Sequence, residues 1–284
     1  MKKKLQAVLQ ERVDSCFSSR TVSEDDKVKR KKLLLHNRQA ELLRIQAAGK
    51  VYEKKEIGER TFIRYQVHVQ YFFQQGQEFF IEEEAEEREA IFLNGKLISD
   101  AELEAVPNEE SIPDTYLSPV RLKYEYDRMK AVQYAERWWN DFNPAYHKFE
   151  DDCTNFISQS LHAGGIPMWG SPNRSKGWWM SGESWSYSWT TAHGLYRLLA
   201  SNSGIRTQEV QSAGELMLGD IICIDFEGDG RFDHSLIVTA KDANGMPLVN
   251  AHTTNSRHRY WTYEDSSRYS ENIVYRFFRI LDGS

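Results

Sequence analysis

The sequence predicts an α+β fold with two domains. One observation is a short helical pattern that begins at a cysteine, Cys153, and ends at Gly164-Gly165. Another is a series of apolar stretches after residue 219, separated by turn sequences, which is typical of consecutive antiparallel strands. A third is a region of alternating strands before residue 100. We therefore expect a small α+β domain over residues 1–115 and a larger domain, a helix followed by an antiparallel sheet, over residues 116–284.

The predicted N-terminal domain begins with a basic region over residues 1–50 that has a helical pattern. Residues 61–73 alternate between apolar and polar side chains, which indicates a half-buried strand. Residues 78–93 contain two acidic runs and are expected to form a strand with an exposed acidic face. Residues 106–114, with prolines at both ends of the segment, are the expected linker. The simplest role for this domain is that of an accessory packing module, and the alternative is binding of an anionic polymer or a partner protein.

The second domain opens with a predicted helix over residues 122–142, followed by the cysteine helix. Asp152 is the residue expected to cap that helix, which places Cys153 in its first turn. A thiol at a helix N-terminus lies at the positive end of the macrodipole, which favours the thiolate. The negative charges of Asp151 and Asp152 oppose this by raising the thiol pKa. The local pattern therefore indicates a cysteine nucleophile whose ionisation depends on this balance.

Three strands are expected downstream, over residues 219–226, 233–240 and 248–253. His234 lies at the start of the middle strand, and Asn244-Gly245 is a hairpin signal. The chain order of cysteine, histidine and polar residue fits a thiol, a base that takes its proton, and a third group that orients the base.

The identity of the third group depends on the register of the predicted hairpin. A strict two-residue turn at Asn244-Gly245 places Asn255 opposite His234. A one-residue bulge near Pro247 instead brings other polar residues onto the face of His234, namely Asn250, His252 and Thr254. The sequence leaves these alternatives open.

Four motifs in this order resemble the putative amidase domain of Bacillus-type bacteria: D-C-T-N-F-I-S-Q with G-G-I-P-M, then G-D-I-I, D-H-S-L-I-V-T and N-A-H-T. That domain is similar to the NlpC/P60 and CHAP cell-wall amidases, a papain-like group, and the resemblance covers roughly residues 120–284. It implies a papain-like domain with Cys153 as nucleophile, His234 as base, and His252 or Asn250 as the third member. It also implies cleavage of an amide bond in a peptide or a peptidoglycan-like substrate.

In that mechanism the backbone N–H of Cys153 is expected to bind the oxyanion. The alternatives are an acyltransferase that uses the same cysteine and histidine, or a catalytically silent module that binds the cell wall.

Tryptophans crowd the segment after the cysteine helix, where they are mixed with glycine and serine. Long loops of this composition are uncommon unless they are functional, and aromatic side chains can form the wall of a ligand cleft. Three tryptophans and one acidic residue are the predicted substrate contacts: Trp178, Trp179, Trp185 and Asp152.

Composition restricts the other classes of function. A net charge of −6 and a pI near 5.8 argue against a dedicated nucleic-acid binder. The cysteines are scattered and odd in number, which favours neither a disulfide framework nor a zinc site, and Cys223 fits a small buried side chain. Residues 225–230 resemble a calcium loop, but Leu236 stands where that loop needs a glutamate. No metal and no cofactor is predicted.

The sequence contains no apolar stretch long enough to cross a membrane and no apolar export signal after Met1. These features predict a cytoplasmic protein without a membrane span. Export by another route, or association with the spore or cell wall, is the alternative, and the oligomeric state is left open.

Overall fold

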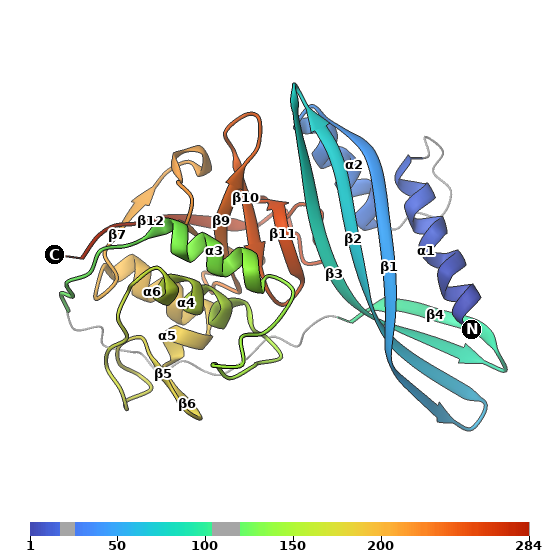
Figure 1. Cartoon of the computed structure of the whole chain (residues 1–284), viewed down its shortest axis with the longest axis horizontal. Coiled ribbons are helices and arrows are strands. Elements are labelled where there is room, and N and C mark those ends of the chain that lie inside the picture. Colours follow the sequence, from blue (N-terminus) through green and yellow to red (C-terminus); the bar gives the residue numbers. More distant parts are fainter. Residues whose placement is uncertain (18–25, 104–119, 284) are drawn as a thin grey trace. The chain divides into compact units, whose positions relative to one another are not determined.

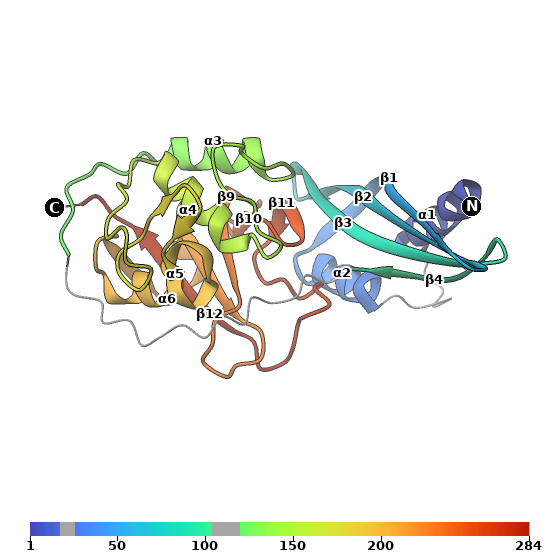
Figure 2. The same ribbon diagram turned by 90° about the horizontal axis from the view of Figure 1, so that it is seen from below.

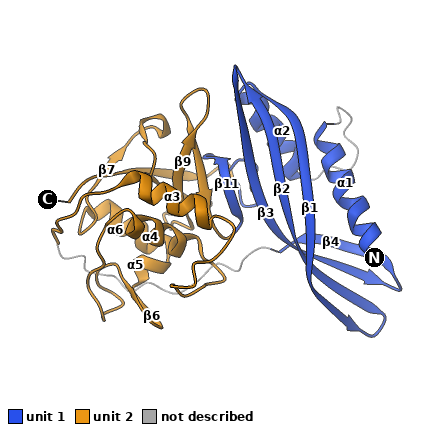
Figure 3. Cartoon of the chain, in the orientation of Figure 1, with its two compact units in different colours: residues 1–104, 254–269 blue, residues 105–253, 270–284 orange. Residues whose placement is uncertain are grey.

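The computed structural model describes residues 1–17, 26–103 and 120–283. The chain divides into two compact units (Figure 3). Unit 1 comprises Met1–Glu104 and Thr254–Tyr269, and unit 2 comprises Ala105–Thr253 and Ser270–Ser284. The predicted boundary near residue 115 missed the return of residues 254–269 to the N-terminal unit. The linker predicted over residues 106–114 lies outside the described residues.

Unit 2 is an antiparallel sheet covered by helices. The sheet has the strand order β10-β9-β8-β12-β7. Figures 1 and 2 show α4, α5 and α6 clustered together in this unit. The elements are α3 (Arg128–Trp138), α4 (Cys153–Ala163), β5 (Met180–Ser181), β6 (Ser184–Trp185), α5 (Tyr187–Thr190), α6 (Ala192–Ser201), β7 (Thr207–Val210), a 3₁₀ turn (Ala213–Glu215), β8 (Ile221–Asp225), β9 (His234–Lys241), β10 (Pro247–Ala251) and β12 (Val274–Ile280).

The core of unit 2 joins its helices to one face of the sheet. Phe156, Ile157 and Leu161 of α4 pack in one apolar cluster with side chains of β8, β9 and β12. Cys223 is fully buried in the same cluster, as the sequence predicts. The cysteine helix and the three strands that follow it are confirmed. Unit 2 is therefore α+β with an antiparallel sheet.

Among the described residues, no helix is both long enough and apolar enough to span a membrane.

Unit 1 is built on a long antiparallel sheet. Figure 1 shows β1, β2 and β3 as curved strands lying side by side. Two further strands pair with the same edge of β3: β4 with Arg88–Leu93, and β11 with Glu83–Ala85. The elements are α1 (Lys2–Phe17), α2 (Asp26–Asn37), β1 (Ala40–Ile57), β2 (Arg60–Gln75), β3 (Glu78–Leu93), β4 (Lys96–Glu102) and β11 (Asn255–Tyr260). The strand predicted over residues 61–73 is confirmed, but residues 40–50, expected to be helical, belong to β1.

The acidic run of β3 faces the core rather than solvent. Glu82, Glu84 and Glu86 lie opposite apolar residues of β2, and cross-strand partners share one face of a sheet. That face is covered by helices, so all three glutamates are almost fully buried. The predicted exposed acidic face is therefore wrong. Because both faces of β3 carry charged residues, the sequence alternation does not show which face the helices cover.

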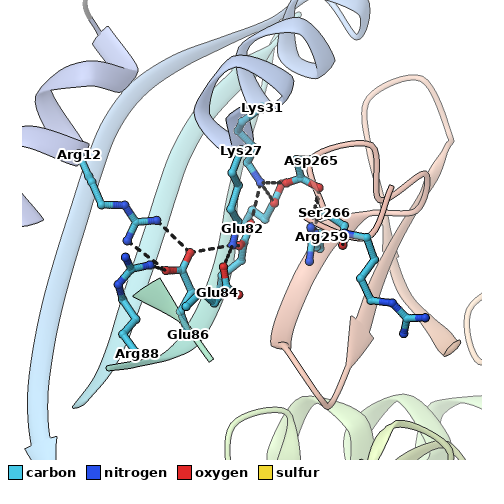
Figure 4. Close-up of polar contacts among 12 residues, drawn as sticks. Arg12, Lys27, Lys31, Glu82, Glu84, Glu86, Arg88, Arg259, Asp265 and Ser266 are labelled. Carbon is cyan, nitrogen blue, oxygen red and sulfur yellow. Dashed lines mark hydrogen bonds and ion pairs between the residues drawn. The ribbon is translucent and has the colours of Figure 1, made fainter. Parts of the chain in front are cut away.

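Two lysines of α2 compensate these buried carboxylates (Figure 4). The Lys31 ammonium contacts Glu82, Glu84 at 3.0 Å and Asp265 at 2.8 Å. Lys27 contacts Glu84 at 3.0 Å and Glu86 at 2.7 Å. Each buried carboxylate in this group therefore has a cation beside it, as buried charges require.

The cations outweigh the effect of burial on two of these acids. Burial alone raises the pKa of Glu86, but the charges of Lys27 and Arg12 lower it to about 2. Burial likewise raises the pKa of Asp265, and Arg259 and Lys31 lower it to about 2. Both side chains therefore stay ionised, and α2 is held to β3 by charge as well as by apolar packing.

Replacing Lys31 with methionine tests this network. Lys31→Met keeps the length of the side chain but leaves three carboxylates without the ammonium that they share. We expect unfolding to become easier by about 3–5 kcal/mol, the usual cost of breaking a buried ion pair. Urea unfolding followed by circular dichroism measures the change. Lys54→Met, at an exposed pair, is the control and should leave the midpoint nearly unchanged. Equal midpoints for Lys31→Met and wild type would contradict this account.

Candidate active site

The N-terminus of α4 is capped by Thr253, two residues after the end of β10. The backbone N–H groups of Asp152 and Cys153 both donate to Thr253 Oγ1, each at 3.1 Å. The Thr253 hydroxyl in turn donates to Asp151 Oδ1 at 2.9 Å. Asp152 occupies the cap position, as predicted, but its side chain makes no capping hydrogen bond. The sequence does not identify Thr253 as the capping group, because it lies far along the chain and only its place in the N-A-H-T motif singles it out.

The Asp152 side chain ties together three segments around α4. Its Oδ1 accepts the Phe149 N–H at 3.1 Å and Asn155 Nδ2 at 2.9 Å. Its Oδ2 lies 2.7 Å from His252 Nδ1. Asp152 is 2% exposed, as is Cys153, and its contact with substrate stays a prediction. Its carboxylate is used up by internal hydrogen bonds and orders the polypeptide around the thiol.

The thiol of Cys153 is buried and held in its neutral form. Burial raises its pKa well above the usual value, and Asp151 raises it further through its charge and by a hydrogen bond with the thiol. Hydrogen bonds from Thr154 and from the backbone of Ser235 act in the opposite direction but do not outweigh these effects. The two aspartates were expected to oppose ionisation of the thiol. Asp151 has this effect, whereas Asp152 points to His252. In this state burial and Asp151 also outweigh the favourable helix position.

His234 begins the strand that reaches the thiol. The hydroxyl oxygen of the next residue, Ser235, lies 3.5 Å from Thr154 Oγ1, which places the start of β9 at the first turn of α4. Ser235 lies opposite Cys223, which belongs to the core against the helices. Because consecutive strand residues point to opposite faces, the His234 side chain leaves β9 on the other face, where its ring lies 6.1 Å from that of Phe226.

The hairpin between β9 and β10 differs from both predicted registers. The chain turns over Asp242–Met246 with Gly245 at φ 77°, a three-residue loop instead of a two-residue turn. The predicted bulge is present, between Leu248 and Val249. The extra loop residue and the bulge each shift the register by one residue in the same direction, and a total shift of two leaves the faces as in the strict turn. Asn250 therefore pairs with Ile237 and shares its face, away from His234. Asn255 lies in unit 1, where it pairs with Ala85.

The predicted third members of the catalytic group therefore face other partners. His252 Nδ1 bonds to Asp152 and Nε2 lies 2.7 Å from the Trp138 carbonyl, while the ring stacks on Phe156 with centroids 4.1 Å apart. Asn250 accepts from Thr239 and donates to Glu136. His252 thus connects Asp152 to α3. The register that was expected to bring either residue to the His234 ring is wrong.

Two of the three predicted substrate-binding tryptophans are core residues. Trp178 is fully buried and donates to Ser158 Oγ at 2.9 Å. Trp179 is also buried, and its Nε1 donates to backbone carbonyls of its own loop. Neither side chain is exposed in this structure, and a contact of either with substrate stays a prediction. The apolar packing of this loop uses them.

Trp185 is the third of the tryptophans predicted to bind substrate, and it is only partly buried. Its ring stacks on His147 at 4.9 Å and meets the edge of Phe149 at 4.7 Å. His147 accepts a hydrogen bond from Asn155 through its carbonyl, and Phe149 donates its N–H to Asp152. The three rings therefore form an aromatic wall that is anchored to the first turn of α4. Of these three rings, only Trp185 was predicted from the sequence.

Two acidic groups within the described ranges have ligand atoms within 4.8 Å of one another. In unit 1, Lys31 already contacts all three acids of the group Glu82, Glu84 and Asp265. In unit 2, the Asp225 carboxylate of the group Asp225, Glu227 and Asp233 accepts N–H bonds from Gly228 at 2.7 Å and Gly230 at 2.8 Å. Both groups therefore have a structural explanation without a metal ion.

Comparison with known proteins identifies the family. Residues 125–278 match the family model described as "Putative amidase domain". The "Uncharacterized protein YhbB" of Bacillus subtilis (strain 168) is 47% identical over 267 residues, which is 90% of this chain and 86% of that protein. The "Uncharacterized protein YjcM" of the same organism is 30% identical over 161 residues, 52% of this chain and 37% of that protein. No solved structure matches. The chain belongs to the putative amidase domain family, as its motifs predict.

Removing the charge of Asp151 should make the thiol easier to ionise. Asp151→Asn keeps an oxygen that can accept from Thr253 but loses the negative charge that raises the Cys153 pKa. The pH profile of alkylation by iodoacetamide should therefore shift to lower pH, with several-fold faster labelling near about pH 8. Peptide mass spectrometry identifies the labelled cysteine, and Cys16 and Cys223 serve as internal references.

Glu150→Gln is the matched control, because it removes one negative charge from the adjacent residue, which the structure leaves largely exposed. If the pH profile of alkylation for Asp151→Asn is unchanged or shifted to higher pH, this carboxylate does not hold the thiol neutral.

Proposed function

We propose that this protein is a cysteine-dependent hydrolase that cleaves an amide bond. The observation that supports this best is the meeting of the two motif segments: Thr154 Oγ1, next to the Cys153 thiol in α4, lies 3.5 Å from the hydroxyl oxygen of Ser235, next to His234. Membership in the family, together with its description, supports amide hydrolysis as the reaction. The arrangement of helix and antiparallel sheet is compatible with a papain-like fold, which remains part of the proposal.

His234 is proposed as the base. β10 pairs with β9 only as far as Ile237, and the chain then turns back to α4 at Thr253. The imidazole can approach the thiol around this end of β9, in keeping with catalytic hydrogen bonds that tighten only when substrate binds. The imidazole takes the thiol proton, and the thiolate forms a bond to the amide carbonyl carbon. The leaving amine takes the proton from the imidazolium, and water then cleaves the thioester.

The proposed substrate is a peptide of the cell wall or a similar peptide. The aromatic wall of Trp185, His147 and Phe149 offers flat apolar surface beside α4, suited to peptide or sugar groups. The same cysteine and histidine could pass the acyl group to an amine instead of water. A silent wall-binding module would bind the material and leave it intact. Product analysis separates these outcomes.

Digestion of purified peptidoglycan tests the proposal. We expect the wild-type protein to release soluble fragments with new free amino groups, detected by chromatography and mass spectrometry. Cys153→Ala should lower the rate by about 10³-fold or more, because the nucleophile is lost. His234→Ala should lower it by about 10²–10⁴-fold, the usual contribution of a general base.

Cys16→Ala is the matched control. Cys16 belongs to α1 of unit 1, so its replacement should leave the cleavage rate unchanged. Retained cleavage by a folded Cys153→Ala protein would overturn the proposal. Sedimentation of wild-type protein with the wall material, without released fragments, would favour the silent module.

A further inference from the structure

Thr253 occupies the position at which an amide-cleaving site needs an oxyanion. The N–H groups of Asp152 and Cys153 follow one another in the chain and converge on a single oxygen at 3.1 Å each. Successive N–H groups aimed at one point form an anion-binding nest. Here the occupant of the nest is the neutral hydroxyl of a threonine. The N–H of Cys153, expected to bind the oxyanion, is therefore already in use.

We infer that Thr253 is a latch: its hydroxyl fills the nest in the resting protein and withdraws when the carbonyl oxygen of the substrate takes its place. The inference rests on the proposed function, because it assigns the nest to the oxyanion formed by Cys153. Thr253 is a positioning residue in this scheme and does not react itself.

The hydrogen bonds of the Thr253 hydroxyl explain why it competes for the nest. It donates its proton to Asp151 Oδ1 at 2.9 Å, which turns its lone pairs toward the two N–H groups. A negatively charged oxyanion is a better acceptor for these donors than a neutral hydroxyl, because charge-assisted hydrogen bonds are about twice as strong. The latch is thus strong enough to close an empty site and weak enough to yield to an oxyanion.

The backbone of Thr253 favours release. Its φ of 80° lies in a region that β-branched residues rarely adopt. Such a conformation persists only when surrounding contacts hold it, here the hydrogen bonds to Asp151 and to the start of α4. The first segment of unit 2 ends at Thr253, and the next residue, Thr254, belongs to unit 1. Rotation of the backbone between these two residues could therefore withdraw the hydroxyl without moving α4.

The resting thiol agrees with a closed latch. Burial and the charge of Asp151, the acceptor of the Thr253 hydroxyl, raise the pKa of Cys153. Closing the latch therefore holds in place the carboxylate that disfavours the thiolate. One contact keeps both the nucleophile and the oxyanion donors inactive.

The test uses the full-length protein and the aldehyde acetyl-glycinal. The Cys153 thiol adds to the aldehyde: an S–C bond forms, the C=O π bond breaks, and the thiol proton ends on the former carbonyl oxygen. Thr253→Gly removes the hydroxyl and suits the positive φ. We expect its dissociation constant for the aldehyde to fall about tenfold below that of wild type, since hydrogen bonds to the hydroxyl no longer compete.

Thr253→Ser keeps the hydroxyl and should bind the aldehyde like wild type. Thr254→Gly makes the same change at the adjacent threonine of the same loop and should also leave affinity unchanged. Circular dichroism and the unfolding midpoint show that each variant is folded. A purely structural role for Thr253 predicts weaker binding by Thr253→Gly, because removing a helix cap loosens α4.

Equal or weaker aldehyde binding by folded Thr253→Gly would overturn the latch. Absence of aldehyde binding in every variant, while iodoacetamide still labels Cys153, would also overturn the latch. That outcome would not contradict the assignment of Cys153 as the nucleophile. Retained peptidoglycan cleavage by Cys153→Ala would instead overturn the proposed function, and the latch with it.

Discussion

The candidate site depends on one buried carboxylate, that of Asp152. A buried carboxyl group is tolerated only when its oxygens have hydrogen-bond partners, and the partners of Asp152 come from three segments. Phe149 belongs to the loop before α4, Asn155 to α4 itself, and His252 to the chain after β10. Removing this carboxylate would leave those donors buried without their partner. The position of the first turn of α4 therefore follows from Asp152.

A second consequence concerns His252. Its ring is held at both nitrogens: Nδ1 lies 2.7 Å from Asp152 Oδ2, and Nε2 lies 2.7 Å from the Trp138 carbonyl. The ring is also stacked on Phe156, within the core of unit 2. Fixing His252 in this way places the next residue, Thr253, against the backbone of Cys153. The thiol, its neutral state and the occupied oxyanion position thus share one structural origin.

Local features of the site were predictable from the sequence, and features that join distant segments were not. The bounds of α4 follow from its apolar spacing and from Gly164, both of which are local. The register of β10 depends on a loop residue and a bulge that together shift it by two residues, and the sequence pattern does not report both. The cap supplied by Thr253 and the burial of Glu82 and Glu84 arise only when separate elements pack together. Trp178 and Trp179 show the same limit, because an aromatic-rich loop can serve a cleft or a core.

The central claim, that Cys153 is an acylating nucleophile, is tested most directly by trapping the acylated protein. A p-nitrophenyl ester of acetyl-glycine carries the same acyl group as the aldehyde and has a leaving group that needs no proton. Rapid acid quenching, followed by intact mass and peptide mass spectrometry, locates the acyl group. The account predicts a single thioester on Cys153 that disappears with time and is absent from Cys153→Ala. Release of nitrophenol without any adduct on Cys153, or with an adduct only on Cys16, would contradict it.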